Sequence, residues 1–450
     1  MFLSGCAVGP MYKTPEINLS DRYSLIAPVS EASARDLHWW TDFNDSTLNA
    51  LVHQGMQGNL DVAEARERVR EAEANVRRDG VALTGNGEIE ATGNSRGGES
   101  TQVSVTGSFG LGGRTQWAER AARERLEAAE LGVGEARRLL LSSLGTAYID
   151  MRFLQRTLET RQQDLQSRRR TLRDLNKQLD AGAATKLDVL RARALVAETQ
   201  AEIPAVTADI IQQRNRISTL LGIPVGELGI DLGYKGSQPA PRGVSNMGVP
   251  ADLLRARPDI RIAERRYAAA VSDVGVAEAS RYPSLSLSGL ITAPLNSGSW
   301  NESFVAGLSV PVFSQPSLAA SVDAAESRAH QAYLVWRRTV LVAVEQVETA
   351  LADLRASNQA VQASREVVQL NQRSLDLTRR LLVESGDTTV LDLIDRERSV
   401  SNARATLAAN MRELANAYIA LRVALGVGHE EIAEVVSRDA VMNAGEVIIE

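Results

Sequence analysis

The sequence GAATKLDVL at residues 182–190 returns as GDTTVLDLI at residues 386–394, 204 positions further along the chain. Each copy continues as a helical pattern that ends at a leucine–glycine pair, at residues 221–222 and 425–426. Between these landmarks both copies carry an apolar residue at every seventh position: Val189, Val196, Ile203, Ile210 and Ile217, then Leu393, Val400, Leu407, Leu414 and Leu421. A repeat of this length indicates a duplicated half of one fold rather than a short solenoid unit.

A longer apolar heptad precedes each copy of the repeat. It occupies residues 116–181 in the first half and residues 317–385 in the second. Heptads sustained over this length predict helices that wind side by side. At 1.5 Å per residue, each of these helices would span about 100 Å.

Shorter helical segments complete each half. A return helix, at residues 185–221 or 388–425, would span about 55 Å, and the helix before the strands, at residues 47–80 or 252–280, about 45–50 Å. Stacked end to end, the two match one long helix. We therefore predict a helical cylinder about 100 Å tall with strands at one end and the hairpin turns at Gly182 and Gly386 at the other. Pro204 is expected to kink the first return helix.

Alternating apolar and polar residues predict four strands of about ten residues, arranged as hairpins at residues 83–112 and 283–313. Val103 and Val105 alternate with Gln102 and Ser104, and residues 284–288 read SLSLS. Four strands cannot close a barrel, and an open sheet edge cannot lie in lipid, so closure needs strands from other copies. Such alternation is typical of outer-membrane barrels. The alternative is a small soluble sandwich that caps a coiled coil.

Composition argues against several classes of function. The net charge of −6 excludes the basic surface of a nucleic-acid-binding protein, and the arginines at residues 168–170 are interpreted as a solvated helix face. The sequence contains no run of 18 consecutive apolar residues and therefore predicts no transmembrane helix. The four histidines lack the paired spacing of a zinc site, and the glycines at residues 107–113 lack the Lys-Ser/Thr of a phosphate loop. We therefore expect no catalytic residues, cofactor or metal, and no enzyme.

The single cysteine, Cys6, follows Leu3-Ser4-Gly5 in the order of a bacterial lipoprotein processing site. Cys6 is therefore the predicted site of lipidation. The alternative is a free thiol in a frayed terminus. Because a complete signal peptide does not fit in five residues, we expect the start of the chain to be truncated or its start codon to be assigned too late.

The sequence resembles the TolC-like outer-membrane factors, and among them the lipoprotein branch of OprM-like, or NodT-type, efflux channels. The resemblance covers essentially the whole chain. It departs from the family pattern at Met11, where an acidic residue is usual, and at residues 110–114 (GLGGR), which replace a more aromatic, acidic segment. The matching stretches are both turn motifs and residues 5–15 (GCAVGPMYKTP), 39–45 (WWTDFND), 59–63 (NLDVA), 257–260 (RPDI) and 282–285 (YPSL).

This resemblance implies a mainly α protein with a membrane β-barrel. A homotrimer would form a 12-stranded barrel, with four strands from each chain, above a long α-helical periplasmic barrel. It would be lipid-anchored in the bacterial outer membrane, extend into the periplasm, and dock to a periplasmic adaptor and an inner-membrane pump. The corresponding domain map is an N-terminal arm at 1–46, a first repeat at 47–226, an equatorial linker at 227–251, a second repeat at 252–427 and an equatorial tail at 428–450.

The resemblance also implies a periplasmic gate. In OprM-like channels a Leu and an Asp four residues apart on the second return helix form the aperture, and these positions match Leu391 and Asp395. Residues i and i+4 share one helix face, so threefold symmetry would produce a leucine constriction and a ring of carboxylates. In the alternative, Leu391 packs within the hairpin and Asp395 is a solvated charge. Asp392 is the competing carboxylate, although its counterpart Asp188 suggests a structural role shared by the two turns.

The function expected from these features is the outer-membrane channel of a tripartite efflux or export system. The alternative function is that of a structural coiled-coil protein of the periplasm or cytoplasm without a pore. The sequence does not specify the cargo, which could be a drug, a dye, a metal ion or a secreted signal molecule, nor the cognate pump.

Overall fold

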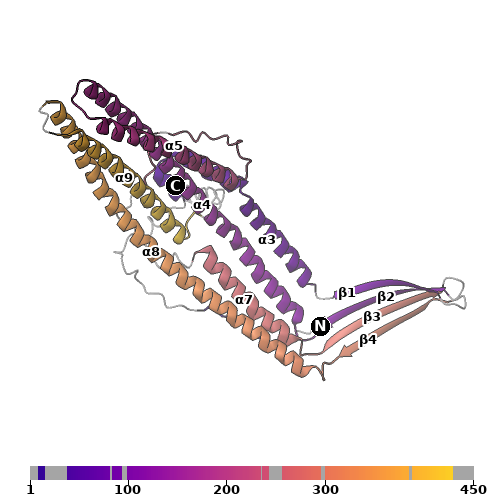
Figure 1. Ribbon diagram of the computed structural model, residues 1–450. Coiled ribbons are helices and arrows are strands. Elements are labelled where there is room, and N and C mark those ends of the chain that lie inside the picture. The colour runs from indigo at the N-terminus through magenta and orange to yellow at the C-terminus, as the bar shows by residue number, and fades with distance from the viewer. Residues whose placement is uncertain are drawn as a thin grey trace, which may run out of the picture. The chain divides into compact units, whose positions relative to one another are not determined.

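The computed structural model describes residues 9–15, 38–81, 84–93, 99–234, 236–242, 256–294, 299–384 and 388–428. These residues form long helices and one antiparallel sheet (Figure 1), so the predicted mainly helical fold with four strands is confirmed. Cys6, Gly386 and most of the predicted tail, from residue 429 onward, lie outside the described residues.

The helices follow the predicted periodicity closely. The two long helices are α4 (Arg114–Asp180) and α8 (Gln315–Glu384), and the return helices are α5 (Lys186–Leu220) and α9 (Val390–Ala424). The helix expected at residues 47–80 is divided at Asn59, and α5 continues through Pro204 as one helix. The shorter elements are η1 (Trp39–Phe43), α2 (Ser46–Gly58), α3 (Leu60–Asp79) and α7 (Pro258–Ala279).

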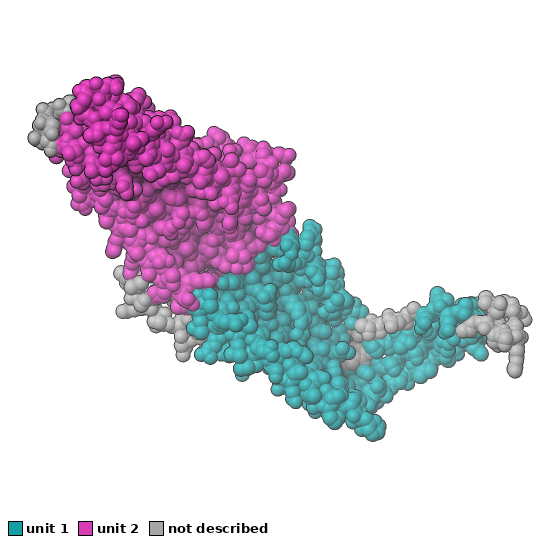
Figure 2. Space-filling view, viewed as in Figure 1, with its two compact units in different colours: residues 1–19, 64–133, 258–342 teal, residues 20–63, 134–257, 343–450 magenta. Residues whose placement is uncertain are grey.

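The chain folds into two compact units, coloured separately in Figure 2. Unit 1 contains residues 1–19, 64–133 and 258–342. Unit 2 contains residues 20–63, 134–257 and 343–450. Each unit takes segments from both copies of the repeat, so the units do not correspond to the two repeats.

The sheet of unit 1 joins the two predicted hairpins. Its strands are β1 (Thr84–Gly93), β2 (Glu99–Gly110), β3 (Ser284–Pro294) and β4 (Asn301–Ser309), paired antiparallel in the order β1-β2-β3-β4. The register aligns Ile89 with Val103, and Val103 with Ile291. Among the described residues, neither β1 nor β4 has a further strand beside it.

This register gives the sheet one apolar and one polar face, because successive side chains point to opposite sides of a strand. Ile89 and Phe304 of the apolar face are 76% and 84% exposed, so no described element covers that face at these residues. The apolar face carries Ile89, Val103, Val105, Leu285, Leu287, Ile291, Phe304 and Leu308, with Thr101 and Glu302 as polar exceptions. The polar face carries Glu88, Glu90, Gln102, Ser104, Thr106, Ser286 and Ser288, with Leu290 and Val305 as apolar exceptions.

The connection between β2 and α4 explains why the segment at residues 110–114 (GLGGR) is rich in glycine. The amide of Leu111 donates a hydrogen bond to the carbonyl of Pro283 at 3.1 Å. A Cβ atom on Gly112 would lie 2.7 Å from the carbonyl oxygen of Ala279. Since that distance is too short for any side chain, glycine allows the start of α4 to approach the end of α7. The core of unit 1 lies between α7 and α8 and contains Val271, Val274, Val322, Ala325 and Ala329.

In unit 2, two antiparallel helical hairpins, α4–α5 and α8–α9, pack along their predicted heptad positions (Figure 1). The buried heptad residues include Leu144 and Met151 of α4, Val347, Leu354 and Val361 of α8, and Leu414 and Leu421 of α9. Near the turns, Leu375, Leu393 and Val400 form a smaller apolar cluster. The sequence interpretation of these stripes as side-by-side helical seams is therefore confirmed.

Candidate functional site

Both return helices begin with the same hydrogen-bonded cap. The hydroxyl of Thr389 accepts from the amide of Asp392 at 3.2 Å, and the Asp392 carboxylate accepts from the Thr389 amide at 2.9 Å. Thr185 and Asp188 form the same reciprocal pair at the start of α5. Such capping boxes satisfy amides that a helix leaves without partners at its N-terminus. The repeated aspartate therefore has one structural role at both turns.

The cap also changes the acidity of these aspartates. Hydrogen bonds from the side chain and the backbone of Thr389 lower the pKa of Asp392, and Thr185 lowers the pKa of Asp188 in the same way. Each carboxylate is therefore more firmly ionised than an ordinary aspartate. The helix dipole further favours a negative charge in this first turn.

The two predicted gate residues, Leu391 and Asp395, lie in the first turns of α9, away from its buried face. Leu391 is 46% exposed and Asp395 is exposed, whereas Leu393 and Ile394 between them are buried. Residues 391 and 395 therefore share the side of α9 that the single chain leaves uncovered. Of the two predicted turn glycines, Gly182 has a φ of 74°, a left-handed conformation that suits glycine at a helix C-terminus.

A groove of about 800 Å³ lies beside these turns, between α4, α8 and α9. Its walls include Thr171 and Leu175 from α4, Arg379 and Leu382 from α8, and Glu397 from α9. Most of its lining side chains are polar, and the apolar ones are Leu175, Leu382, Val390 and Leu393.

Glu397 holds the three helices of this groove together. Its carboxylate accepts hydrogen bonds from the Ser167 hydroxyl at 2.9 Å and the Thr171 hydroxyl at 3.3 Å, both on α4, and from the Arg379 guanidinium of α8 at 2.9 Å. The Glu397 side chain is only 10% exposed. Further along α9, Ser401 donates to Asp164 of α4. The start of α9 is therefore bound to its neighbours by polar contacts as well as by its apolar stripe.

At the other end of α9, the segment η1 forms a buried polar clamp. The hydroxyl of Tyr418 donates to Asp42, the Nε of Arg422 donates to that hydroxyl at 2.9 Å, and Arg422 pairs with Asp42 at 3.1 Å. Burial raises the pKa of Tyr418 despite the nearby arginine, so the hydroxyl stays protonated. Asp42 is thereby fixed to the end of α9.

A second clamp of the same kind fixes the neighbouring residue Asp45 to α4. Tyr148 donates to Asp45 at 2.6 Å, and Arg152 donates to the Tyr148 hydroxyl at 2.9 Å. Sequence reasoning missed both clamps. The available signal was the Tyr-x-x-x-Arg spacing at residues 148–152 and 418–422, which places both side chains on one helix face.

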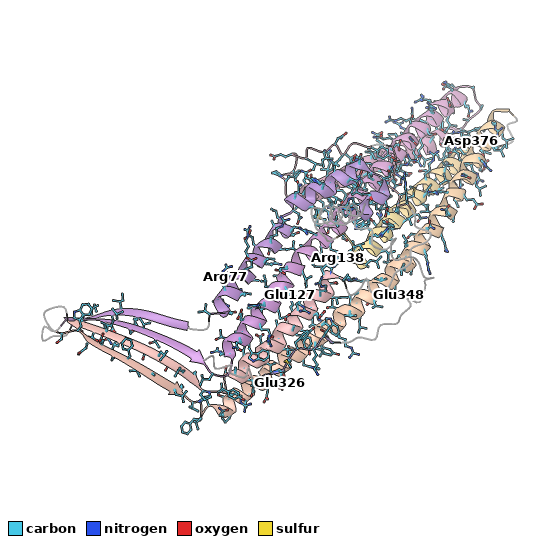
Figure 3. All side chains as sticks on the ribbon, turned by 180° about the vertical axis from the view of Figure 1, so that it is seen from behind. Arg77, Glu127, Arg138, Glu326, Glu348 and Asp376 are labelled. Atoms are coloured by element: carbon cyan, nitrogen blue, oxygen red, sulfur yellow. The ribbon has the colours of Figure 1, made fainter. Side chains whose placement is uncertain are left out.

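The C-terminal ends of both return helices are capped by side chains from outside them. The side-chain Nδ2 of Asn59 donates to the carbonyl of Leu220 in α5 at 2.8 Å, and the side-chain Oδ1 of Asn59 accepts from the backbone amide of Val62 at 3.0 Å. At the end of α9, Arg257 donates to the carbonyl of Ala424 at 2.6 Å, and Arg138 (labelled in Figure 3) donates to that of Val423 at 3.2 Å. These contacts satisfy carbonyls without helical partners, and Asn59 links the end of α5 to the start of α3.

The arginine run predicted to be a solvated face is partly a contact between helices. Arg169 and Arg170 are exposed, but Arg168 donates to the hydroxyl of Thr199 and to the carbonyl of Leu195 on α5. The interpretation was therefore wrong for Arg168, because the antiparallel return of α5 brings acceptors beside it that the sequence of α4 does not reveal.

In unit 1, the short segment 9–15 packs tightly on the helices. A Cβ on Gly9 would lie 2.9 Å from Gly275 of α7 and from Trp117 of α4, so both backbones and the indole are in close contact. The Tyr12 hydroxyl donates to Glu264 at 2.8 Å, and burial, followed by the contact with Glu264, raises the pKa of Tyr12. Arg265 lies between Glu264 and Glu127 (labelled in Figure 3).

Among the described residues, no group of three or more histidine, cysteine, aspartate or glutamate side chains is placed to hold a metal ion. Within the same part of the chain, no helix combines the length and the apolar character needed to cross a membrane.

Comparison with known proteins gives consistent matches over nearly the whole chain. The model of the family described as "Outer membrane efflux protein" matches residues 51–223 and 249–427. Nodulation protein T of Rhizobium leguminosarum bv. trifolii is 36% identical over 96% of this chain and 97% of its own length. The cation efflux system protein CusC of Escherichia coli strain K12 is 28% identical, over 90% and 92%. The solved structure of the outer-membrane channel OprN superposes with a TM-score of 0.80 at 30% identity, covering 94% of this chain and 100% of that one.

Proposed function

The chain belongs to the outer membrane efflux protein family and is the outer-membrane component of a tripartite efflux system. On this basis we propose that three copies form one duct that carries small molecules from the periplasm to the exterior. Family membership does not favour the alternative of a coiled-coil protein without a pore. The duct would receive its cargo from an inner-membrane pump through a periplasmic adaptor.

The observation that supports this proposal most directly is the sheet of unit 1. Its apolar face is exposed, its opposite face is polar, and both outer strands lack a neighbour among the described residues. In lipid, unpaired backbone groups cost several kcal/mol each, so such a sheet must close on itself. Pairing β4 of one copy with β1 of the next would close a barrel of three four-stranded sheets, with leucines toward lipid and serines toward a wet lumen.

A lipid anchor at Cys6 would complete the attachment to the outer membrane. Gly9, three residues further on, packs against Trp117 in the first turn of α4, close to where β2 ends. Acyl chains on Cys6 would therefore enter the membrane near the inner ends of the strands, and each buried methylene would contribute about 0.8 kcal/mol. Mass spectrometry of the mature N-terminus should show an acylated Cys6. An unmodified thiol there would refute the anchor but leave the barrel untouched.

The gate of this duct would lie at the turn between α8 and α9. Leu391 and Asp395 share the uncovered side of α9. Three copies around one axis would bring three leucines together into an apolar constriction and three aspartates into an anionic ring. Such elements restrict flow by dewetting and by holding cations. Asp392 is already engaged in the cap of α9, which leaves Asp395 as the carboxylate free to face the pore.

Planar-bilayer recordings test both the pore and its gate. Wild-type protein should give small, closed-state conductances, and the double variant Leu391→Ala with Asp395→Ala should raise the single-channel conductance. Cells that carry the double variant should become more sensitive to vancomycin. Asp392→Asn, one residue from Leu391, is the matched control, because it removes the neighbouring charge but keeps a side-chain oxygen that can accept from the Thr389 amide in the cap; it should leave the conductance near wild type. If only Asp392→Asn opens the channel, Leu391 and Asp395 are not the gate residues. Absence of any conductance from correctly folded protein would refute the duct itself.

A further inference from the structure

A group of exposed arginines lies where the helices of the first half of the chain meet the sheet. Two of them end helix α3, and the others lie in the first turns of α4, directly after β2. A Cβ atom on Gly80 would lie 3.3 Å from the carboxyl carbon of Glu119 on α4, so the end of α3 adjoins these turns. We call this group the arginine cluster; it consists of Arg77 (labelled in Figure 3), Arg78, Arg114, Arg120 and Arg123.

The arginine cluster carries more positive charge than its neighbours neutralise. Arg78 pairs with a carboxylate on the next residue at 2.8 Å, and Arg123 pairs with a carboxylate one turn before it. The other three members have no acidic partner within the part of the chain that the structure describes: Arg77, Arg114 and Arg120. These three guanidinium groups are therefore available to an anionic ligand.

The fold does not require this charge, because the second half of the chain builds the corresponding connection without it. The last turn of α3 contains two arginines, whereas that of α7 contains no basic residue. Helix α4 begins with Arg114, whereas α8 begins with Gln315 and has neither lysine nor arginine over residues 315–324. Arg281, which follows α7, is neutralised by Glu278 at 3.1 Å. The excess charge is therefore a property of the first half alone.

Arg114 occupies a position that is unfavourable for helix stability. It is the first residue of α4, where the helix dipole disfavours a cation, and the first turn contains no acidic residue to offset it. The amides at the start of a helix attract anions. A basic side chain at this place therefore weakens the isolated helix slightly but strengthens its attraction for an anion.

Arg120 is held in place by an aromatic ring. Its guanidinium lies over the indole of Trp117, 4.7 Å from the ring centroid, and Trp117 is only 3% exposed. The same indole contacts Gly9, so the segment that follows Cys6 arrives at the arginine cluster. A charge fixed in this way loses less side-chain entropy when it binds a ligand.

The arginine cluster also lies at a particular level of the sheet. Helix α4 begins four residues after the end of β2 at Gly110, and α3 ends shortly before β1 begins at Thr84. These strand ends are opposite the ends that are joined by the hairpin loops (Figure 1). In a sheet that crosses the outer membrane, this level corresponds to the headgroups of the inner, periplasmic leaflet.

We propose that the arginine cluster binds the headgroup phosphates of anionic phospholipids in the inner leaflet of the outer membrane, next to the point where the chain from Cys6 arrives. This inference rests on the proposed placement of the sheet in that membrane. Guanidinium groups form charge-assisted, paired hydrogen bonds with phosphate oxygens, and basic side chains beside membrane-spanning segments bind anionic headgroups. Lipids bound in this way would neutralise the cluster and fix the depth of the sheet in the membrane.

Native mass spectrometry of the full-length protein, released from detergent and titrated with single lipids, tests this site. Anionic phosphatidylglycerol should bind at least tenfold more tightly than zwitterionic phosphatidylethanolamine, because each basic side chain at an anionic surface contributes about fivefold to the affinity. The combined variant Arg77→Gln, Arg114→Gln and Arg120→Gln should lose this preference.

The matched control removes the same charge elsewhere. Arg169→Gln, Arg173→Gln and Arg193→Gln replace three exposed arginines of the α4–α5 hairpin, and this variant should keep the preference. A single substitution, Arg114→Gln, gives α4 the residue that begins α8 and removes a cation from the helix N-terminus, so it should fold at least as well as wild type. It should bind phosphatidylglycerol about fivefold more weakly.

The outcomes separate the lipid site from the duct. If trimers form and conduct in planar bilayers but the two lipids bind equally well, or Arg114→Gln and the control variant bind phosphatidylglycerol alike, the proposal is overturned. Displacement of phosphatidylglycerol by excess inorganic phosphate would assign the cluster to soluble phosphate compounds and would also overturn it. If neither trimers nor conductance are found, the proposed function fails, and the lipid site fails with it.

Discussion

At the scale of single residues, the strongest anchors are charged groups buried against η1. Arg422 is 5% exposed and contacts both the Tyr418 hydroxyl and Asp42. Removing one member of a buried, charged hydrogen-bonded group is costly, because the remaining partners stay buried without a hydrogen bond and keep their desolvation penalty. The clamps at Asp42 and Asp45 therefore fix one short segment to two helices.

Replacement of Arg422 by alanine should destabilise the protein by about 1.5–3 kcal/mol, because Asp42 and Tyr418 would both lose a partner. Tyr418→Phe should cost only about 1 kcal/mol, since it removes one hydrogen bond. The matched control is Arg398→Ala on the same helix. Arg398 is exposed, and surface substitutions usually change the free energy of unfolding by about 0.5 kcal/mol or less. Chemical unfolding followed by circular dichroism would measure all three variants, and equal effects of Arg422→Ala and Arg398→Ala would contradict the clamp.

The cap at the start of α9 should respond to pH. The pKa of Asp392 is lower in the folded chain than its ordinary value of 3.8. Its contribution to stability is therefore present above the ordinary pKa and is lost as the pH falls through the depressed one. Hydrogen exchange at the first amides of α9 should accelerate on acidification below the ordinary pKa. Asp392→Asn should remove that pH dependence, whereas Asp188→Asn should remove it only at α5. An unchanged profile in Asp392→Asn would assign the effect to another group.

At the scale of elements, the sheet is organised by the alternation of its strands. Leu287 lies on the apolar face opposite Gly107 and Ala306, and Ser286 lies on the polar face. The polar face also holds Glu88 and Glu90, so a closed barrel would have an acidic, hydrated lumen.

A charge on the apolar face should therefore cost much more than one on the polar face. Leu287→Arg should destabilise the membrane-inserted protein by about 2–4 kcal/mol if it lies at mid-bilayer. Ser286→Arg, one residue away, should be much less harmful because its side chain would point into water. The fraction of heat-modifiable trimer on semi-native gels would measure both. Equal loss of trimer in the two variants would show that the faces are assigned incorrectly.

At the scale of the whole molecule, α9 is held differently at its two ends. Its C-terminal end is fixed by the Asp42 clamp and by Arg257 and Arg138. Its N-terminal end depends on the capping box and on Glu397. Because the proposed gate residues belong to this N-terminal end, the contacts of Glu397 should decide how firmly the duct is closed.

Removal of the Glu397 carboxylate should loosen the gate. Glu397→Ala leaves Ser167, Thr171 and Arg379 without their shared acceptor, and we expect more frequent and larger single-channel openings. Glu413→Ala, on the same helix, is the control, because its carboxylate is 54% exposed and contacts neither α4 nor α8 in the described contacts. Openings indistinguishable from wild type in Glu397→Ala, with the trimer intact, would show that these contacts do not restrain the gate.

The elements and the faces they bury follow from local patterns in the sequence. The 204-residue repeat, the heptads and the alternating residues predict the helices and the strands, and the structure reproduces them within a few residues. The repeat also paired Asp392 with Asp188 and suggested a structural role for both at the turns, which the structure shows to be a capping box. These features are local: periods of two and seven residues depend on which side of a helix or strand becomes buried. The family resemblance supplied Leu391 and Asp395, which periodicity alone would not have singled out.

Which polar groups contact each other depends on tertiary packing. Ser167 and Glu397 are separated by 230 residues, and Asp42 and Arg422 by 380. Sequence reasoning left Glu397 and both Tyr–Arg clamps unassigned, interpreted Arg168 as solvated, and did not foresee the break at Asn59. A hydrogen bond requires its two atoms within about 3 Å and in the right direction. Two polar atoms reach this distance and direction only after the helices have packed in register. An apolar stripe, in contrast, can be buried against any partner of similar shape.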